Sequence, residues 1–413
     1  MSQAARVREG VRMRAVIVGP GKIGCGYLAP LFRDAGWEIV LAARTPDQAE
    51  RIRAAGGFGV RITGSGVTRE LRDVPAVVTD TPAFAEAIAS ADLVVTCVGV
   101  NQARGLGPVL ARALSTRDLF LPLQVWVVEN QDCAPVLERS VRTAAARASL
   151  SLPPVGFAGA VAEVAVSRGD WRGVDRPVFV GDPIRRLRVD ESALIAPLPR
   201  LPAVEATPCY RARLQEKLFV FNAGHALCAY LGVLRGHRSI DAAVRDRFLR
   251  PLVAGSMLES ARALASAYPG LNGDVHECVA KTMRRFEDAE LADPVDRVAR
   301  DPLRKLRPND RLVGAAKLIR ATVGRVPRHF ALGIAGALLY RNEHDEEASR
   351  LSRMLERQGL AHALRAVCGL QPDDELARAV AQRYRGFIFT QGGVLFPPVY
   401  EAADVVFPET EAA

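Results

Sequence analysis

The sequence predicts an α/β protein in which an N-terminal doubly wound parallel sheet is followed by a mainly α-helical second domain. Three observations support this prediction. Short apolar runs alternate with helical patterns from Met13 to about Phe157. A glycine-rich turn directly follows the first apolar run. From Pro208 to about Arg385, apolar residues recur at helical spacing with polar residues between them.

The composition is that of a globular protein. The 413 residues are 49% hydrophobic and 24% charged, which allows about two or three domains with buried cores. The net charge of +9 is spread along the chain. No basic run carries the interleaved aromatic residues typical of a nucleic-acid surface, and no stretch approaches the roughly 20 continuous apolar residues of a membrane span. We therefore expect neither a nucleic-acid nor a membrane partner.

The cysteines indicate a reducing compartment. They number seven, are widely spaced and include no C-x-x-C pair. This pattern favours neither a disulfide framework nor a structural zinc site, so we expect no bound metal and a cytoplasmic location. Residues 1–12 carry charge without an apolar core, and we expect them to be a disordered leader.

The first domain is expected to span residues 13–206. Its strand candidates are rich in Val and Ile, as in a sheet that is covered on both faces. They are residues 14–18, 38–43, 76–79, 93–98 and 125–128. The helical candidates between and after them lie near residues 23–35, 46–55, 84–89, 106–113 and 134–146. From residue 157 onward the pattern is strand-like and rich in proline, which predicts a strand-rich extension of the sheet.

The turn after the first strand reads Gly19-Pro20-Gly21-Lys22-Ile23-Gly24, a G-x-G-x-x-G that opens a helical pattern. In such a motif the first glycine allows a tight turn, the second lets the backbone approach a pyrophosphate, and the third permits close packing of helix on strand. The context of strand and helix predicts a Rossmann-type dinucleotide site that includes Lys22 and Ile23. The alternative is a glycine-rich turn that binds nothing.

The end of the second strand indicates which dinucleotide is bound. An acidic residue there would bind the adenosine ribose of NAD, but the sequence is Ala43-Arg44-Thr45. Arg44 could form a bidentate contact with a 2′-phosphate and Thr45 could donate a hydroxyl hydrogen bond, so NADP(H) is favoured and NAD(H) is the alternative. Arg44 could equally be a solvated loop residue. Gly99, at the end of a later strand, is either a backbone contact to the nicotinamide half or a simple turn.

The second domain is expected at residues 207–384, with a C-terminal extension of strand and turn character at residues 385–413. Its helical candidates are residues 214–234, 239–267, 273–286, 315–321, 329–340 and 346–360. The first of them places three polar groups, Lys217, Asn222 and His225, in an otherwise apolar stretch. On a regular helix they fall at about 0°, 140° and 80°, so they could share one wall of a cleft.

These three side chains suit hydride-transfer chemistry. Burial would favour a neutral amine on Lys217, which could accept the hydroxyl proton as hydride leaves the carbon. Asn222 could donate to the developing alkoxide, and His225 could hold an adjacent oxygen or relay a proton. On residue type alone, the set could equally belong to the surface and the cap of a helix.

This segment resembles the signature region of the long-chain polyol (mannitol) dehydrogenase family, which includes the mannitol-1-phosphate 5-dehydrogenases. The Lys-x4-Asn-x2-His pattern of the family is met by Lys217, Asn222 and His225. The resemblance continues through residues 127–130, 301–306 and 309–312, and it covers roughly residues 13–370.

The resemblance implies an NAD(P)-dependent oxidoreductase that interconverts a polyol and its keto sugar without a metal. Mannitol 1-phosphate and fructose 6-phosphate are the default pair, so the expected substrate is a phosphorylated small molecule. The resemblance also implies a site in a cleft between the two domains. There Lys217 would be the general base, Asn130 and Asn222 would stabilise the oxyanion, and His225 would orient the substrate as a donor. We expect a monomer or a homodimer.

The chain departs from the family in three places. Ala43 and Arg44 replace the acidic residue at the end of the second strand, and residues beyond Leu370 match no known pattern. Glu163 stands where the family has Asp, and we regard it as a candidate substrate contact. Cations in the matching motifs could bind a phosphate or could be ordinary helix-end charges. They are Arg235, His237, Arg238, Arg304, Lys305 and Arg311.

Two other functions are compatible with these residues. One is a reductase of the ketopantoate or hydroxyacid type, which also joins a Rossmann domain to a helical domain and uses Lys and Asn. The other is a catalytically idle dinucleotide-binding sensor. The complete Lys217, Asn222 and His225 set favours the polyol family, and an idle protein would have no reason to bury a lysine.

Overall fold

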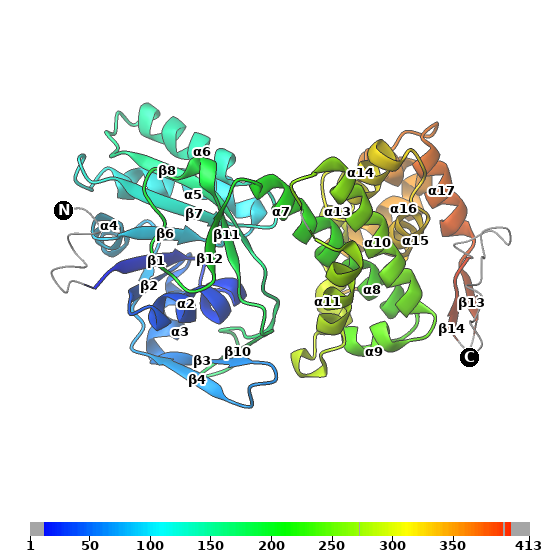
Figure 1. Cartoon of the computed structure of the whole chain (residues 1–413), viewed down its shortest axis with the longest axis horizontal. Helices are drawn as coiled ribbons and strands as arrows, with labels where there is room; N and C mark the ends of the chain where they lie inside the picture. Colours follow the sequence, from blue (N-terminus) through cyan, green and yellow to red (C-terminus); the bar gives the residue numbers. More distant parts are fainter. Residues whose placement is uncertain (1–11, 272, 391–392, 398–413) are drawn as a thin grey trace. The chain divides into compact units, whose positions relative to one another are not determined.

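The computed structural model describes residues 12–271, 273–390 and 393–397, and the chain divides into two compact units, Met1–Leu214 and Gln215–Ala413 (Figure 1). From the sequence we placed the boundary at 206/207. Except for Arg12, the expected leader lies outside the described residues, as do residues 391–392 and 398–413 of the expected C-terminal extension.

The first unit is built on an eight-stranded sheet with the order β12-β11-β8-β7-β6-β1-β2-β5. Its strands are β1 (Arg14–Val18), β2 (Glu38–Ala43), β5 (Ala76–Val78), β6 (Leu93–Thr96), β7 (Leu123–Val128), β8 (Val155–Ala162), β11 (Leu187–Asp190) and β12 (Val204–Thr207). The strands from β5 to β8 in this order are parallel, and β11 is antiparallel to β8. The predicted doubly wound sheet is therefore confirmed.

Helices cover both faces of this sheet, which explains why its strands are continuous apolar runs. Ala15 and Ile17 of β1 face one core, whereas Val16 and Val18 face the other. The helices are η1 (Gly24–Leu28), α2 (Ala29–Asp34), α3 (Pro46–Ala54), α4 (Pro82–Ala89), α5 (Val100–Leu114), α6 (Ala134–Arg147) and the short η2 (Glu191–Ala193). The first three contribute to the core that contains Ile17, and α4 to α6 contribute to the core that contains Val16.

A second, four-stranded sheet with the order β4-β3-β10-β9 completes the first unit (Figure 1). Its strands are β3 (Gly57–Ile62), β4 (Thr68–Arg72), β9 (Val166–Arg168) and β10 (Val178–Gly181). The sequence did not predict β3 and β4. In β4 all residues but Leu71 are exposed, so the strand has no apolar alternation to reveal it. This sheet packs against the helix that follows the glycine turn, since Gly26 faces Val166 and Phe179.

The second unit is mainly helical, as predicted. Its helices are η3 (Lys217–Phe221), α8 (Asn222–Leu234), α9 (Ile240–Arg245), α10 (Leu249–Ala267), α11 (Val275–Phe286), η4 (Ala289–Leu291), α12 (Val295–Ala299), α13 (Pro302–Lys305), α14 (Val313–Val323), α15 (Arg328–Leu339), α16 (Glu346–Ala366) and α17 (Glu375–Arg385). A hairpin of β13 (Ile388–Thr390) and β14 (Gly393–Leu395) follows.

Helix α8 lies at the centre of this unit and packs on α10, α12 and α15. Glycines allow the close approach, because a Cβ at Gly333 would lie 2.6 Å from Leu227 Cδ1. The helix predicted at residues 239–267 is divided into α9 and α10. The division lies at Asp246, whose Oδ1 accepts the Phe248 N–H at 2.7 Å. Helix α17 was not predicted.

Helix α7 (Tyr210–Glu216), η3 and α8 form one continuous helix, Tyr210–Leu234, which is long and apolar enough to cross a membrane. Lys217, Asn222 and His225 interrupt its apolar run, so it does not contain 20 continuous apolar residues. In addition, 78% of the apolar window of this helix is buried inside the structure, as in the core helix of a globular protein. Its apolar residues are explained by internal packing.

Candidate functional site

The glycine turn lies at the carboxyl end of β1, where the strand order of the large sheet reverses, the position at which doubly wound sheets bind ligands. Gly19 has φ +106°, and a Cβ there would lie 2.6 Å from the carbonyl oxygen of Cys97. A Cβ at Gly24 would lie 2.3 Å from the carbonyl oxygen of Gly19. At Gly21 a Cβ would meet no described atom within 4 Å. Packing therefore requires the outer two glycines, whereas the middle one leaves room for a pyrophosphate.

The helix after this turn begins at Lys22 and Ile23 and widens into the π-helical η1. The ammonium group of Lys22 donates to the backbone carbonyl of Ser167, in the second sheet. The sequence suggested Lys22 as a cofactor-binding residue, but this ammonium group has a partner within the protein. A contact of Lys22 or Ile23 to a dinucleotide stays a prediction.

Arg44 lies at the end of β2 with its side chain exposed. Within the described ranges, its guanidinium forms no hydrogen bond or ion pair. Thr45 is the N-cap of α3, and its Oγ accepts the N–H of Gln48 at 3.3 Å. The Thr45 hydroxyl can still donate its own proton outward. The arrangement can accept an anion at the start of α3, although Asp47 in the first turn opposes it.

The ends of β6 and β7 are joined by a hydrogen bond that the sequence did not predict. Gly99, with φ +95°, is the N-cap of α5, and its N–H donates to Glu129 Oε1 at 2.7 Å. The Gly99 N–H is therefore already bonded within the protein. It is not available as the donor of the predicted backbone contact to the nicotinamide half. Asn130 directly follows Glu129 and is half-buried, so the bond fixes the chain just before this candidate oxyanion donor.

Glu163 follows β8, and its Oε1 accepts a hydrogen bond from Arg188 of β11. Arg188 also lies 3.5 Å from Glu205 in β12. The carboxylate of Glu163 thus belongs to an ion-pair network across the antiparallel edge of the large sheet. Its predicted contact to substrate stays a prediction.

Lys217, Asn222 and His225 lie on the continuous helix, but the helix is not regular at this place. The segment Lys217–Phe221 is π-helical, and the N–H of Asn222 donates to the carbonyl of Lys217. A hydrogen bond from residue i+5 to residue i places the two about one turn apart. The side chains of Lys217 and Asn222 therefore project from neighbouring faces, closer than the roughly 140° that a regular helix would give. His225 follows Asn222 by three residues in regular α8.

His225 contacts Asp293, a residue that we did not predict from the sequence. Its Nε2 lies 3.2 Å from Asp293 Oδ2, and its ring stacks on Phe286 with centroids 4.9 Å apart. Asp293 directly precedes the N-cap of α12, and Arg297, one turn into that helix, donates to both of its carboxylate oxygens at 2.5 Å. The sequence carries no local signal for this contact, because Asp293 lies far from His225 along the chain.

Burial of this group favours a neutral imidazole. Burial lowers the pKa of His225, the hydrogen bond and charge of Asp293 oppose it, and the charges of Arg297 and Arg311 lower it further. Burial raises the pKa of Asp293, but the hydrogen bonds from His225 and Arg297 and the positive charge of Arg297 outweigh it and lower the pKa to about 2. A neutral His225 that donates from Nε2 to Asp293 presents Nδ1 as an acceptor. In this state Nδ1 can accept from a hydroxyl, whereas the resemblance implied that His225 is a donor.

Most of the candidate phosphate-binding cations have partners inside the second unit. Arg235 and His237 both bind the Asp246 carboxylate, Arg304 binds Asp301 and Asp310, and Arg311 binds Asp310. Lys305 is buried and donates to the carbonyls of Val298 and Arg300. Arg238 is exposed. These contacts within the unit account for the charged residues in the motifs without a bound phosphate.

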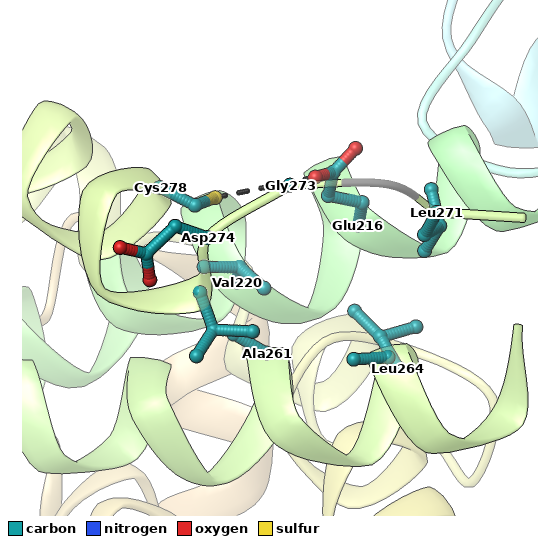
Figure 2. Close-up of a pocket in the computed structure, with 10 residues that line it drawn as sticks. Glu216, Val220, Ala261, Leu264, Leu271, Gly273, Asp274 and Cys278 are labelled. Carbon is teal, nitrogen blue, oxygen red and sulfur yellow. Dashed lines mark hydrogen bonds between the residues drawn. The ribbon is translucent and has the colours of Figure 1, made fainter. Parts of the chain in front are cut away.

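A pocket lies between the helix that carries Lys217, α10 and the start of α11 (Figure 2). It is lined by apolar residues of α10 and of the loop before α11, with Glu216 and Cys278 at its edge, where the Cys278 thiol lies 4.0 Å from Glu216 Oε1. Lys217, Asn222 and His225 do not line it, so it is not the expected substrate pocket. Within the described part of the chain, no three His, Cys, Asp or Glu side chains are grouped to hold a metal ion.

Both units match models of known protein domains. The model of the mannitol dehydrogenase Rossmann domain matches residues 13–153, and that of the mannitol dehydrogenase C-terminal domain matches residues 211–387. A mannitol-1-phosphate 5-dehydrogenase of Bacillus pumilus is 31% identical over 376 residues, which are 89% of this chain and 98% of the relative. The enzyme of the same name from Geobacillus thermodenitrificans is 31% identical over 382 residues, 90% of this chain and 98% of the relative.

Two solved structures share the fold. The ternary complex of Pseudomonas fluorescens mannitol 2-dehydrogenase with NAD and D-mannitol has a TM-score of 0.72 at 17% identity, and the match covers 91% of this chain and 92% of that chain. A substrate-free D-sorbitol dehydrogenase has a TM-score of 0.61 at 15% identity, with 91% and 93% covered.

Proposed function

Because this chain belongs to the mannitol dehydrogenase family, we propose that it is an NAD(P)-dependent oxidoreductase that interconverts mannitol 1-phosphate and fructose 6-phosphate. The observation that carries this proposal is the similarity to mannitol-1-phosphate 5-dehydrogenases over 98% of their length. Similarity to these relatives supports neither of the alternatives, a ketopantoate-type reductase or an idle sensor.

A nicotinamide dinucleotide bound at the glycine turn would supply the acceptor for the hydride that leaves the carbon bearing the hydroxyl group. The amine of Lys217 takes the hydroxyl proton, and the carboxamide of Asn222, on the neighbouring helix face, donates to the oxygen as negative charge develops. Neutral His225 accepts a hydrogen bond at Nδ1 from an adjacent substrate hydroxyl. For Asn130, in the first unit, we keep the role of a further donor to the substrate oxygen.

We further propose that NADP(H) is the preferred dinucleotide. The support is the exposed Arg44 guanidinium, which forms no ion pair within the described ranges and lies beside the Thr45 hydroxyl at the start of α3. A guanidinium can form a bidentate contact with a phosphate. Replacing Arg44 with Ala should raise the KM for NADPH about tenfold and leave that for NADH within about twofold.

The test is the absorbance at 340 nm when fructose 6-phosphate is mixed with NADPH or with NADH, with Lys217→Met as the inactive control. Rapid loss of absorbance with NADPH and much slower loss with NADH supports both proposals, and loss with NADH alone overturns the choice of dinucleotide. If the wild type consumes neither dinucleotide with fructose 6-phosphate, the proposed substrate is wrong. Ketopantoate and unphosphorylated fructose in parallel reactions then identify the correct substrate class.

A further inference from the structure

Two side-chain hydrogen bonds join the glycine turn to β9 of the second sheet and to the loop that follows β9. The indole Nε1 of Trp171 donates to the backbone carbonyl of Pro20 at 2.8 Å in a buried position. The ammonium of Lys22 donates to the carbonyl of Ser167 in β9. Both bonds join residues 20–22 of the turn to one short segment, residues 167–171. Two separate contacts from the same segment hold the turn at its middle and at its helical end.

The orientation of Trp171 is itself fixed by packing. Its side chain is 4% exposed and lies edge-on to Phe58, with ring centroids 5.7 Å apart at 80°, and against Phe179 at 6.0 Å. The chain reaches Trp171 through Gly169, which has φ +106° and passes so close to Phe179 that a Cβ would lie 2.2 Å from its ring. An indole held by two aromatic rings cannot turn its N–H away from Pro20 without disturbing this core.

The Pro20 carbonyl belongs to the peptide group that also contains the N–H of Gly21. Because this group is planar and trans, a bond that fixes the carbonyl also fixes the direction of the N–H. The N–H of Gly21 donates to the carbonyl of Gly19 at 2.8 Å, which closes the turn. The hydrogen bond from Trp171 thus fixes the peptide group that precedes Gly21, the glycine whose Cβ position is open.

We propose that Trp171 is a positioning residue for the dinucleotide, and that the second sheet holds the glycine turn in the conformation that receives the pyrophosphate. This inference rests on the proposed function, since it requires that a nicotinamide dinucleotide binds at this turn. It assigns a role in binding to a sheet that neither the sequence motifs nor the catalytic side chains explain. Trp171 acts through the turn and takes no part in the transfer of hydride.

The expected effect is on affinity and not on the rate at saturation. The bond from Trp171 to Pro20 does not involve the ligand, so its loss weakens binding only by letting the turn leave the competent conformation. The apparent Kd then rises by the factor by which the competent fraction falls. Loss of one buried hydrogen bond should raise the Kd for the dinucleotide about five- to tenfold. The kcat at saturating dinucleotide should change by less than about twofold, because the bound turn is again in place.

The test compares Trp171→Phe with Trp126→Phe as a matched control. Trp126 is also fully buried in the first unit, but its indole N–H forms no hydrogen bond with any described residue. Both changes remove similar ring volume from the same unit. Titration calorimetry gives the Kd for NADPH and NADH, urea unfolding gives the stability, and the absorbance assay gives kcat and KM. We expect both variants to lose stability, and only Trp171→Phe to lose affinity with an unchanged kcat.

A second variant covers the case in which Trp171→Phe does not fold. Incorporation of β-(3-benzothienyl)alanine at position 171 replaces the N–H by sulfur and keeps the shape of the ring system. We expect the same rise in Kd, about five- to tenfold, for this variant because it loses the same hydrogen bond. If it binds NADPH as the wild type does, or if Trp126→Phe loses as much affinity, the inference is wrong. A wild type that binds neither dinucleotide would overturn the proposed function and this inference together.

Discussion

Replacing Asp293 with Asn should change the state of His225 without removing the imidazole. In the wild type the Nε2–H of neutral His225 donates to Asp293 Oδ2, while Arg297 donates to both carboxylate oxygens. An amide cannot accept at both positions; with its oxygen at the Oδ1 position, to which Arg297 Nε donates, its NH2 group takes the Oδ2 position and faces His225. Nε2 must then accept, and the ring proton moves to Nδ1. The atom that we propose to accept from a substrate hydroxyl becomes a donor.

The structure gives the size of the effect on stability. Burial raises the pKa of Asp293, but the hydrogen bonds from His225 and Arg297 and the positive charge of Arg297 overcome this effect and lower the pKa from the ordinary 3.8 to about 2. With the Asp293 side chain 8% exposed, this difference corresponds to about 2 kcal/mol of unfolding free energy. Because the folded pKa is the lower one, this stability is fully present above about pH 4 and is lost as the pH falls towards 2.

The effect on activity follows because Nδ1 of His225, now a donor, would face a substrate hydroxyl that donates to it in the wild type. We expect kcat/KM to fall about 10- to 100-fold at pH 7, which corresponds to about 1.4 to 2.8 kcal/mol. Urea unfolding at pH 7 should show a loss of about 2 kcal/mol for Asp293→Asn, and the difference from the wild type should shrink below about pH 4. Long-range ¹H–¹⁵N correlation spectra of ¹⁵N-histidine protein report which ring nitrogen of His225 carries the proton.

Asp246 provides a matched control for this experiment. Its Oδ2 accepts from Arg235 Nε at 2.8 Å and lies 2.9 Å from His237 Nε2, so it repeats the arrangement of one carboxylate with a histidine and an arginine. Burial opposes the shift, but His237, the Phe248 amide and Arg235 lower its pKa to about 2 as well. Asp246→Asn should lose stability and keep kcat/KM. If Asp293→Asn also keeps kcat/KM within about twofold, or if His225 retains its proton on Nε2, the reasoning is refuted.

Three further predictions test other parts of the two units. Gly21→Ala should leave the unfolding free energy within about 0.5 kcal/mol and weaken NADPH binding in a calorimetric titration, whereas Gly19→Ala should lower the urea midpoint because its Cβ would meet Cys97. Equal affinities of Gly21→Ala and wild type would contradict the open position. Lys217→Met should reduce kcat at least about 100-fold with an unchanged Kd for NADPH, and unchanged turnover would remove its role as the base. Lys305→Met should cost about 1–3 kcal/mol of unfolding free energy with an unchanged KM for fructose 6-phosphate, while a raised KM would place Lys305 in a phosphate site.

The large sheet could be predicted well from the sequence because both of its faces are covered. Residues 14–18 and 38–43 match the observed β1 and β2, since strands buried on both faces stand out as unbroken apolar runs between turn residues. The second sheet could not be predicted in this way. Its strand β4 is mostly exposed, and β3 pairs with β10 from a distant part of the chain, so neither composition nor period reveals them.

The candidate site was predicted to the extent that its residues form local patterns. The glycine spacing and the Lys217, Asn222 and His225 set can be read within short segments. The partners that orient them come from other elements: Asp293 holds His225, and Trp171 holds the glycine turn. Such contacts depend on how strands and helices pack, and the sequence gives no spacing rule for them.

The spacing of the candidate catalytic residues fits a π turn better than a regular α-helix. Lys217 and Asn222 are five residues apart, and Asn222 and His225 are three apart. A separation of three suits one face of an α-helix, whereas a separation of five suits a π turn, in which residues i and i+5 are joined by a hydrogen bond. The observed change from π-helical η3 to regular α8 falls at Asn222, between the two intervals. The wide turn thus brings the side chains at both intervals towards one side of the helix, as the proposed reaction requires, and π turns of this kind are frequent at functional sites.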